Sequence, residues 1–191
     1  MEELERVIKE SDDGKAPGKD NIPYEMIKRL GPKAKQLILH LYNKCWSGNE
    51  QISQMWRTAT IKPQYKEGKD PKKPESYRPI SLTPCLGKLA EKMVANRLSH
   101  YLESNNLLNE NQAGFRQGRN TTDQVLNITQ MATDQIHRRK SPSMTLLTFF
   151  DYEKVYDKVW REGLLFKIMN LGIPWKFTKY VRSFLSARKT T

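Results

Sequence analysis

The sequence predicts an α+β fold in which helices pack on a small antiparallel sheet. Apolar residues recur at three- and four-residue steps over 86–102, which predicts a long helix opened by Pro84. Two short β-prone segments, 56–63 and 77–82, flank a polar loop and predict a hairpin. An apolar run over 143–150, rich in Thr, Leu and Phe, predicts a buried strand that ends at Asp151.

The N-terminal part predicts three short helices. Acids and apolar groups alternate at helical spacing over 2–10, whereas 11–23 is dense in turn formers and excludes regular structure. In that turn, Asn21 tolerates a left-handed backbone. Pro23 opens a helix that Gly31-Pro32 ends, and a further helix follows up to the closing sequence Ser47-Gly48-Asn49.

The remaining helices lie on both sides of the 143–150 run. A Thr-Thr-Asp sequence at 121–123 predicts the start of a helix with Val125, Leu126 and Ala132 facing inward. Two more helices are predicted over 161–169 and 175–185, separated by Gly172-Ile-Pro174.

The charge of the chain favours a polyanionic partner. Its 191 residues suffice for one domain with a core or for a piece of a larger one, and they carry a net charge of +12. Positive charge concentrates over 57–78, which holds seven Lys or Arg and three acids. A basic hairpin beside a cleft can close on a triphosphate or a template backbone, although a solvated loop is the commoner reason for such a charge run. An acidic protein or an anionic membrane surface also fits the charge but explains no motif.

Several protein classes are disfavoured by the sequence. No stretch reaches the roughly 18 apolar residues of a membrane span, and the N-terminus lacks the layout of a signal peptide. Cys45 and Cys85 stand alone, without zinc-site spacing or partners for a disulfide framework. The chain is therefore expected to be intracellular, in the nucleus or the cytoplasm, with no membrane partner.

Two local features suggest chemistry, and each has a plainer explanation. An Asp at the end of a rigid strand can hold a metal ion, but Asp151 would equally well end the strand and cap a turn. The two glycines of Gly114-Phe115-Arg116-Gln-Gly118 let the backbone approach a ligand, while Phe and Arg stack on bases or clamp phosphates. A simple tight turn accounts for the same spacing.

Four segments resemble the reverse transcriptases of non-LTR (LINE- or jockey-like) retrotransposons. The segment from Phe150 to Trp160 resembles their first palm motif. The pair formed by 61–71 and Tyr-Arg-Pro-Ile-Ser-Leu at 77–82 resembles their fingers hairpin. Residues 111–123 resemble the family's Gly-Phe-Arg block, and 15–23 resemble an element that precedes the fingers. The sequence departs from the family pattern at Asn21 (usually Gly), Tyr65 (usually Pro) and Val155 (usually Ala).

The resemblance implies a right-hand polymerase fold that is truncated before the end of the palm. Residues 1–50 would be a helical extension of the fingers, 51–140 the fingers, and 141–191 the first part of the palm. Asp151 would be the catalytic metal ligand. The incoming nucleotide would contact Lys66, Arg78, Tyr156 and Phe150, with the phosphates on the two cations and the sugar against Tyr156. The expected nucleic-acid contacts are Gly114, Phe115, Arg116, Gly118, Arg119 and Lys69.

The implied activity is that of an RNA-directed DNA polymerase, which adds dNTPs to a DNA primer on an RNA template by two-metal nucleotidyl transfer. The family's later carboxylates, in an aromatic-x-Asp-Asp segment, do not occur in this sequence. We therefore expect the chain alone to be inactive, and Mg²⁺ or Mn²⁺ to bind only in the full-length enzyme. The alternative is a non-catalytic nucleic-acid-binding or functionless retrotransposon remnant. A group II intron maturase is a more distant resemblance, and the sequence does not indicate an oligomeric state.

Overall fold

The computed structural model describes residues 1–48, 50–138, 144–152, 155–156 and 158–190. The chain forms two compact units. The first unit comprises Met1–Leu98 together with Arg161–Thr191, and the second comprises Ser99–Trp160. Helix α4 (Cys85–Ser104) continues from the first unit into the second, and each unit is described separately below.

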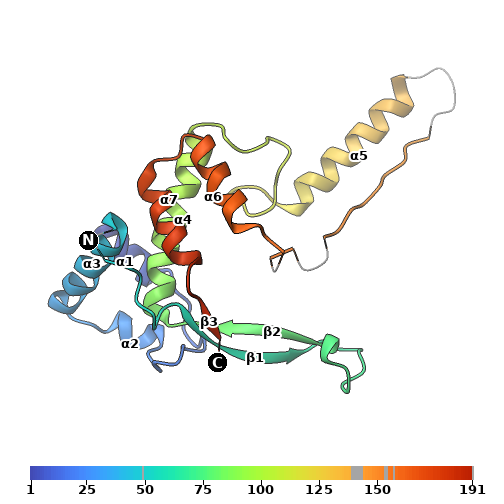
Figure 1. Cartoon of the computed structure of the whole chain (residues 1–191). Helices are drawn as coiled ribbons and strands as arrows, with labels where there is room; N and C mark the ends of the chain where they lie inside the picture. The colour runs from blue at the N-terminus through green and yellow to red at the C-terminus, as the bar shows by residue number, and fades with distance from the viewer. Residues whose placement is uncertain (49, 139–143, 153–154, 157, 191) are drawn as a thin grey trace. The chain divides into compact units, whose positions relative to one another are not determined.

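The three N-terminal helices form where the sequence predicts them: α1 (Glu2–Lys9), α2 (Tyr24–Lys28) and α3 (Pro32–Ser47) (Figure 1). The apolar stripe of α1 is buried, and Arg97 of α4 pairs with Glu3 of α1. Helix α3 ends at Gly48, whose φ of 73° is the left-handed conformation that glycine adopts at little cost. The turn over 11–23 lacks helix and strand, and Asn21 there has a φ of 54°, so the predicted left-handed backbone is confirmed.

The core of the first unit lies between α3, α4 and α7 (Trp175–Leu185). The predicted apolar stripe of α4 is buried in its N-terminal half, at Leu89, Ala90, Met93 and Val94. Trp46 of α3 packs edge-to-face on Phe177 of α7, with ring centroids 4.8 Å apart. Helix α6 (Arg161–Asn170) precedes α7, as the sequence predicts.

The sheet of the first unit has three strands in the order β2-β1-β3. Strands β1 (Thr58–Tyr65) and β2 (Tyr77–Leu82) form the predicted antiparallel hairpin, with a short 3₁₀ turn η1 (Pro74–Ser76) before β2. Strand β3 (Lys189–Thr190) pairs parallel to β1, so the prediction of a purely antiparallel sheet is wrong. A parallel neighbour requires a long connection, and two residues carry no strand signal of their own.

The second unit departs most from prediction. Its long helix α5 (Thr121–Arg138) begins at the predicted Thr121, with Asn120 accepting a hydrogen bond from the Asp123 amide at 2.8 Å. Val125 and Leu126, expected to face inward, are exposed. Residues 144–152 run beside α5 without forming a strand (Figure 1), and all of them are exposed.

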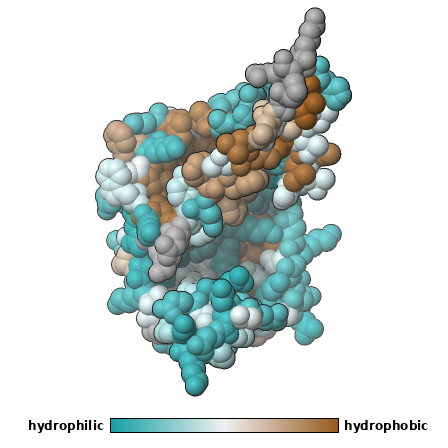
Figure 2. Space-filling model, turned by 90° about the vertical axis from the view of Figure 1, so that its right-hand side faces the viewer, coloured by the Kyte–Doolittle hydropathy of each residue, from teal (hydrophilic) through white to brown (hydrophobic). Residues whose placement is uncertain are grey.

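The prediction of a buried strand that ends at Asp151 is therefore wrong for residues 144–151, while Ser143 lies outside the described residues. A strand needs a hydrogen-bonding neighbour and an apolar face needs a cover. Within the described part of the second unit no strand pairs with this segment, and only Thr145, Leu146 and Leu147 line a groove with α5. The apolar side chains consequently remain on the surface, and Figure 2 shows hydrophobic surface on the upper part of the face that it views.

Helix length and hydropathy bear on membrane insertion. Among the residues described, none of the helices combines the length and the apolar composition that a bilayer crossing needs.

Candidate nucleic-acid interface

The β1–β2 hairpin places its cations by strand register. Gln64 pairs with Arg78 across the ladder, and Lys66 follows Gln64 by two residues. Because side chains alternate between the faces of a strand, Lys66 and Arg78 belong to the same face of the hairpin. Lys62 shares this face, and Lys62 and Arg78 are exposed. The register thus brings together the two cations that the sequence assigns to nucleotide phosphates.

Two tyrosines brace the opposite face of the hairpin. Tyr65 and Tyr77 are directly paired in register, and their ring centroids lie 5.6 Å apart. Each hydroxyl donates to a backbone carbonyl of the connecting loop, Tyr65 to Lys69 and Tyr77 to Pro71. These hydrogen bonds hold the loop that carries Lys69. Tyr65, which replaces the family's usual Pro, therefore has a structural role of its own.

Lys66 lies at the junction between strand and loop. Its amide donates to the Ser76 carbonyl at 2.7 Å, and its Nζ donates to the Glu75 carbonyl at 2.8 Å. A lysine ammonium has three donors, so this bond orients the side chain and leaves two donors for a phosphate. The hairpin can therefore present Lys66, oriented by the Glu75 carbonyl, together with Arg78 to a polyphosphate.

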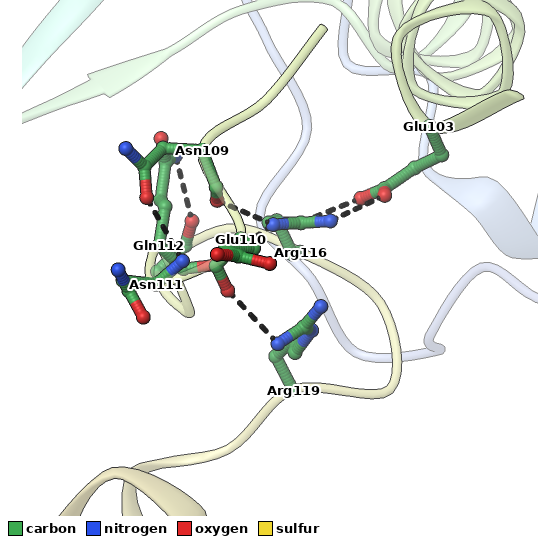
Figure 3. A network of polar contacts seen from close by, with 8 residues as sticks. Glu103, Asn109, Glu110, Asn111, Gln112, Arg116 and Arg119 are labelled. Carbon is green, nitrogen blue, oxygen red and sulfur yellow. Dashed lines mark hydrogen bonds and ion pairs between the residues drawn. The ribbon is translucent and has the colours of Figure 1, made fainter. Parts of the chain in front are cut away.

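The loop 109–118 in the second unit is held by Arg116 (Figure 3). The guanidinium donates from Nε and Nη2 to the two carboxylate oxygens of Glu103, at 2.8 and 2.6 Å. Its Nη1 donates to the carbonyls of Asn109 and Gln112, at 2.8 and 3.2 Å. Only 9% of the Arg116 side chain is exposed. The side chain that the sequence assigns to nucleic acid is thus turned into its own loop.

The Glu103–Arg116 pair perturbs the titration of both groups. Hydrogen bonds from Arg116 hold the pKa of Glu103 below its ordinary value, and the charge of Arg119 acts in the same direction. A carboxylate with a lowered pKa stabilises the folded state above its ordinary pKa of about 4.3, and this contribution is lost as the pH falls through the lowered value. The ion pair is therefore intact at neutral pH.

The other predicted residues of this loop are accessible. Phe115 is 95% exposed and has a φ of 61°, in the left-handed region. Arg119 is exposed and its Nη1 donates to the Glu110 carbonyl at 3.1 Å. A Cβ on Gly114 or on Gly118 would meet no atom within 4 Å, and Gly118 has a φ of 73°, which favours glycine. The loop and the residue that follows it present the Phe115 ring and the Arg119 cation to solvent.

The segment around Asp151 is also accessible. Asp151 and Tyr156 are exposed, and Phe150 is 89% exposed. Lys154 and Asp157, which complete the palm-like motif in the sequence, lie outside the described residues. The structure thus describes Asp151 as a solvent-facing carboxylate in a segment without regular structure.

The family follows from a comparison of the sequence with known proteins. The family model for reverse transcriptase (RNA-dependent DNA polymerase) matches residues 70–191, which include the end of the basic loop, β2, the Gly-Phe-Arg block and Asp151. The chain belongs to the reverse transcriptase family.

Known retrotransposon polymerases resemble the chain over almost its whole length. The probable RNA-directed DNA polymerase from transposon BS of Drosophila melanogaster is 32% identical over 189 residues, which are 99% of this chain. The RNA-directed DNA polymerases from mobile element jockey are 30% identical in Drosophila melanogaster and 29% identical in Drosophila funebris. This chain spans 20% of the length of each of these relatives.

Members of the reverse transcriptase family generally use divalent metal ions, which prefer oxygen ligands. Asp151 can supply one carboxylate. Among the residues whose positions are described, however, no group of three His, Cys, Asp or Glu side chains could hold a metal ion. The donor set described here therefore does not amount to the cage that a pair of catalytic ions needs.

Two structural residues of this reverse transcriptase segment escaped the sequence analysis. Glu103 gave no signal, because an acid near the end of an amphipathic helix usually faces solvent. Gly18 belongs to the Lys-Ala-Pro-Gly segment that resembles the family, but the resemblance does not explain why this position needs glycine. The structure supplies one: a Cβ on Gly18 would lie 2.3 Å from the Pro84 nitrogen, at the start of α4.

Proposed function

We propose that this chain is a segment of an RNA-directed DNA polymerase whose basic hairpin binds phosphate groups. The observation that carries the proposal is the register that puts Lys66 and Arg78 on one face of the β1–β2 hairpin. Arg bonds two phosphate oxygens at once through its planar fork, and Lys adds a mobile point charge. Such a pair suits the triphosphate of an incoming nucleotide, and Lys69 in the exposed loop suits the backbone of the template.

Several of the other residues that the resemblance implies have accessible side chains. Tyr156 and Phe150 are accessible aromatic groups that can lie against the sugar and base of a nucleotide. Phe115 and Arg119 extend from the 109–118 loop, where they can contact a single strand. In the proposed reaction a primer 3′-hydroxyl would attack the α-phosphate in line and displace pyrophosphate, and Asp151 would supply one of several carboxylates to the metal ions.

The phosphate-binding role is tested by a salt titration. We expect the Lys66→Gln, Lys69→Gln, Arg78→Gln triple variant to bind single-stranded RNA more weakly than the parent chain. The slope of log affinity against log salt should shrink by about 2, because each lost phosphate contact removes about 0.7 for a single strand. Fluorescence anisotropy with a labelled 20-nucleotide RNA measures both quantities.

The control for this titration is a variant of equal charge. Lys9, Arg29 and Lys33 are exposed residues outside the hairpin, and changing all three to Gln removes the same three charges. If both triple variants reduce the slope equally, binding follows net charge and the hairpin has no special role. Competition by dNTP, strong for the parent and weak for the hairpin variant, would assign Lys66 and Arg78 to the nucleotide rather than the template.

A primer-extension assay tests catalysis by the chain itself. With Mg²⁺, dNTPs and a primed RNA template we expect no synthesis, because two-ion transfer needs several carboxylates and the described residues gather no such group. The Asp151→Asn variant should likewise show no DNA synthesis. Synthesis by the parent chain that this substitution abolishes would contradict the expectation and show a complete metal site.

A further inference from the structure

The 109–118 loop commits nearly all of the hydrogen-bonding capacity of Arg116 to the protein itself. An arginine has five N–H donors, and in Arg116 four hydrogen bonds run from three nitrogens to Glu103, Asn109 and Gln112. With 9% of the side chain exposed, little of the fork remains for an incoming phosphate. The arrangement differs from that of Arg119, which is exposed and donates to the Glu110 carbonyl (Figure 3).

The neighbouring Phe115 shows the opposite behaviour. Its ring is 95% exposed although it is apolar, and its backbone has a positive φ of 61°. A bulky residue in this region costs of order 1 kcal/mol or more and persists only where the surroundings fix it. The loop backbone is held by the side-chain hydrogen bonds of Arg116 and by two more. The Arg116 backbone N–H donates to the Ala113 carbonyl at 3.3 Å, and the Gln112 side-chain amide donates to the Gly114 carbonyl at 3.3 Å.

We propose that Glu103 and Arg116 are positioning residues, which anchor the loop to α4 so that Phe115 presents its ring to an unpaired nucleobase. This inference rests on the proposed function, because it assumes that the chain binds single-stranded nucleic acid. An aromatic ring stacks on any base through its π-face, and a loop backbone held in place in advance loses less conformational entropy on binding. Arg116 then acts through the loop and does not contact the nucleic acid.

The rival role for Arg116 is that of a phosphate ligand, and the two roles predict opposite effects of Glu103→Gln. If Arg116 bound a phosphate, loss of its competing carboxylate would release the guanidinium and remove a negative charge, so RNA affinity would rise. If the pair is an anchor, the same substitution loosens the loop and affinity falls. The sign of the change therefore separates the two roles.

The binding experiment uses the full 191-residue chain and a labelled single-stranded 12-nucleotide RNA. Phe115→Ala should weaken binding roughly five- to a hundredfold, the range found for loss of base–aromatic stacking, whereas Phe115→Trp should retain it. Glu103→Gln and Arg116→Gln should each weaken binding, and the double variant no more than either one, because both break the same pair. The salt slope should stay at the parent value in all of these variants, whereas a phosphate ligand would lower it by about 0.7.

Glu110→Gln is the matched control. It makes the same acid-to-amide change within the 109–118 loop itself, and the Glu110 carboxylate forms no ion pair within the described part of the chain. Its affinity should equal that of the parent or exceed it slightly. Higher affinity in Glu103→Gln than in Glu110→Gln, or a reduced salt slope in Arg116→Gln, would overturn the positioning role.

Hydrogen exchange tests the anchor without any nucleic acid. In Glu103→Gln the amides of the 109–118 loop should exchange faster than in the parent, while those of α3 should not change. Unchanged loop exchange would refute the anchor even if RNA binding persisted. Faster loop exchange in a chain that binds no RNA would instead refute the proposed function, and the stacking role with it, while the anchor would stand.

Discussion

The Gly18→Ala variant will be destabilised by at least about 3 kcal/mol, although it adds a single methyl group. The new Cβ would lie 2.3 Å from the Pro84 nitrogen and 2.6 Å from the Thr83 carbonyl carbon, and both are backbone atoms. Overpacking against side chains costs roughly 1–3 kcal/mol, and a backbone that opens α4 has less freedom to move than a side chain. Urea unfolding followed by circular dichroism measures the loss.

Gly114→Ala serves as the control for this methyl group. A Cβ on Gly114 meets no atom within 4 Å, and the residue does not have a positive φ. Its stability should therefore stay within about 0.5 kcal/mol of the parent, as for most surface substitutions. Equal midpoints for the two variants would mean that the 11–23 turn does not pack on the start of α4 as described.

Leu89→Ala will reduce the free energy of unfolding by about 2–5 kcal/mol. Leu89 lies in the middle of the buried stripe of α4 and is 1% exposed. The loss combines the transfer free energy of the deleted methyl groups with the cost of the cavity that remains. Because a domain is stable by only about 5–15 kcal/mol, the first unit should melt at a much lower temperature.

Leu37→Ala in α3 is the matched control, because it deletes the same atoms from a helix. Leu37 is 71% exposed, so the change should cost less than about 0.5 kcal/mol. A thermal melt monitored at 222 nm compares the two variants. A loss in Leu37→Ala as large as that in Leu89→Ala would place a cover over α3 and contradict the core described for the first unit.

The elements that the sequence predicted correctly are those with local causes. The stripe of α4, the Gly48 ending of α3 and the two strands of the hairpin each follow from a repeat or a turn residue within a few positions. The register that puts Lys66 and Arg78 on one face comes from the structure, whereas the sequence marked these two cations only through the family resemblance.

The elements that the sequence predicted wrongly depend on partners elsewhere. An apolar run such as 144–150 indicates burial, but it cannot say whether a neighbouring strand or a covering element exists. Strand β3 was missed because its pairing is set by the path of α6 and α7. The prediction that Val125 and Leu126 face inward was wrong because no described element covers them. Arg116 shows this limit within the site, since only the fold reveals that Glu103 takes its guanidinium.

The discontinuous first unit has a consequence for biosynthesis. Ile52, Gln54 and Arg57 form hydrogen bonds to residues 129 to 133 positions later, at the end of α7 and just beyond it. On a ribosome, β1 therefore emerges long before the partners that complete its surroundings. The apolar side chains beside β1 remain uncovered until then. Folding of this unit should be slower than that of a unit built from local contacts, because the closing contacts can form only after α7 has left the exit tunnel.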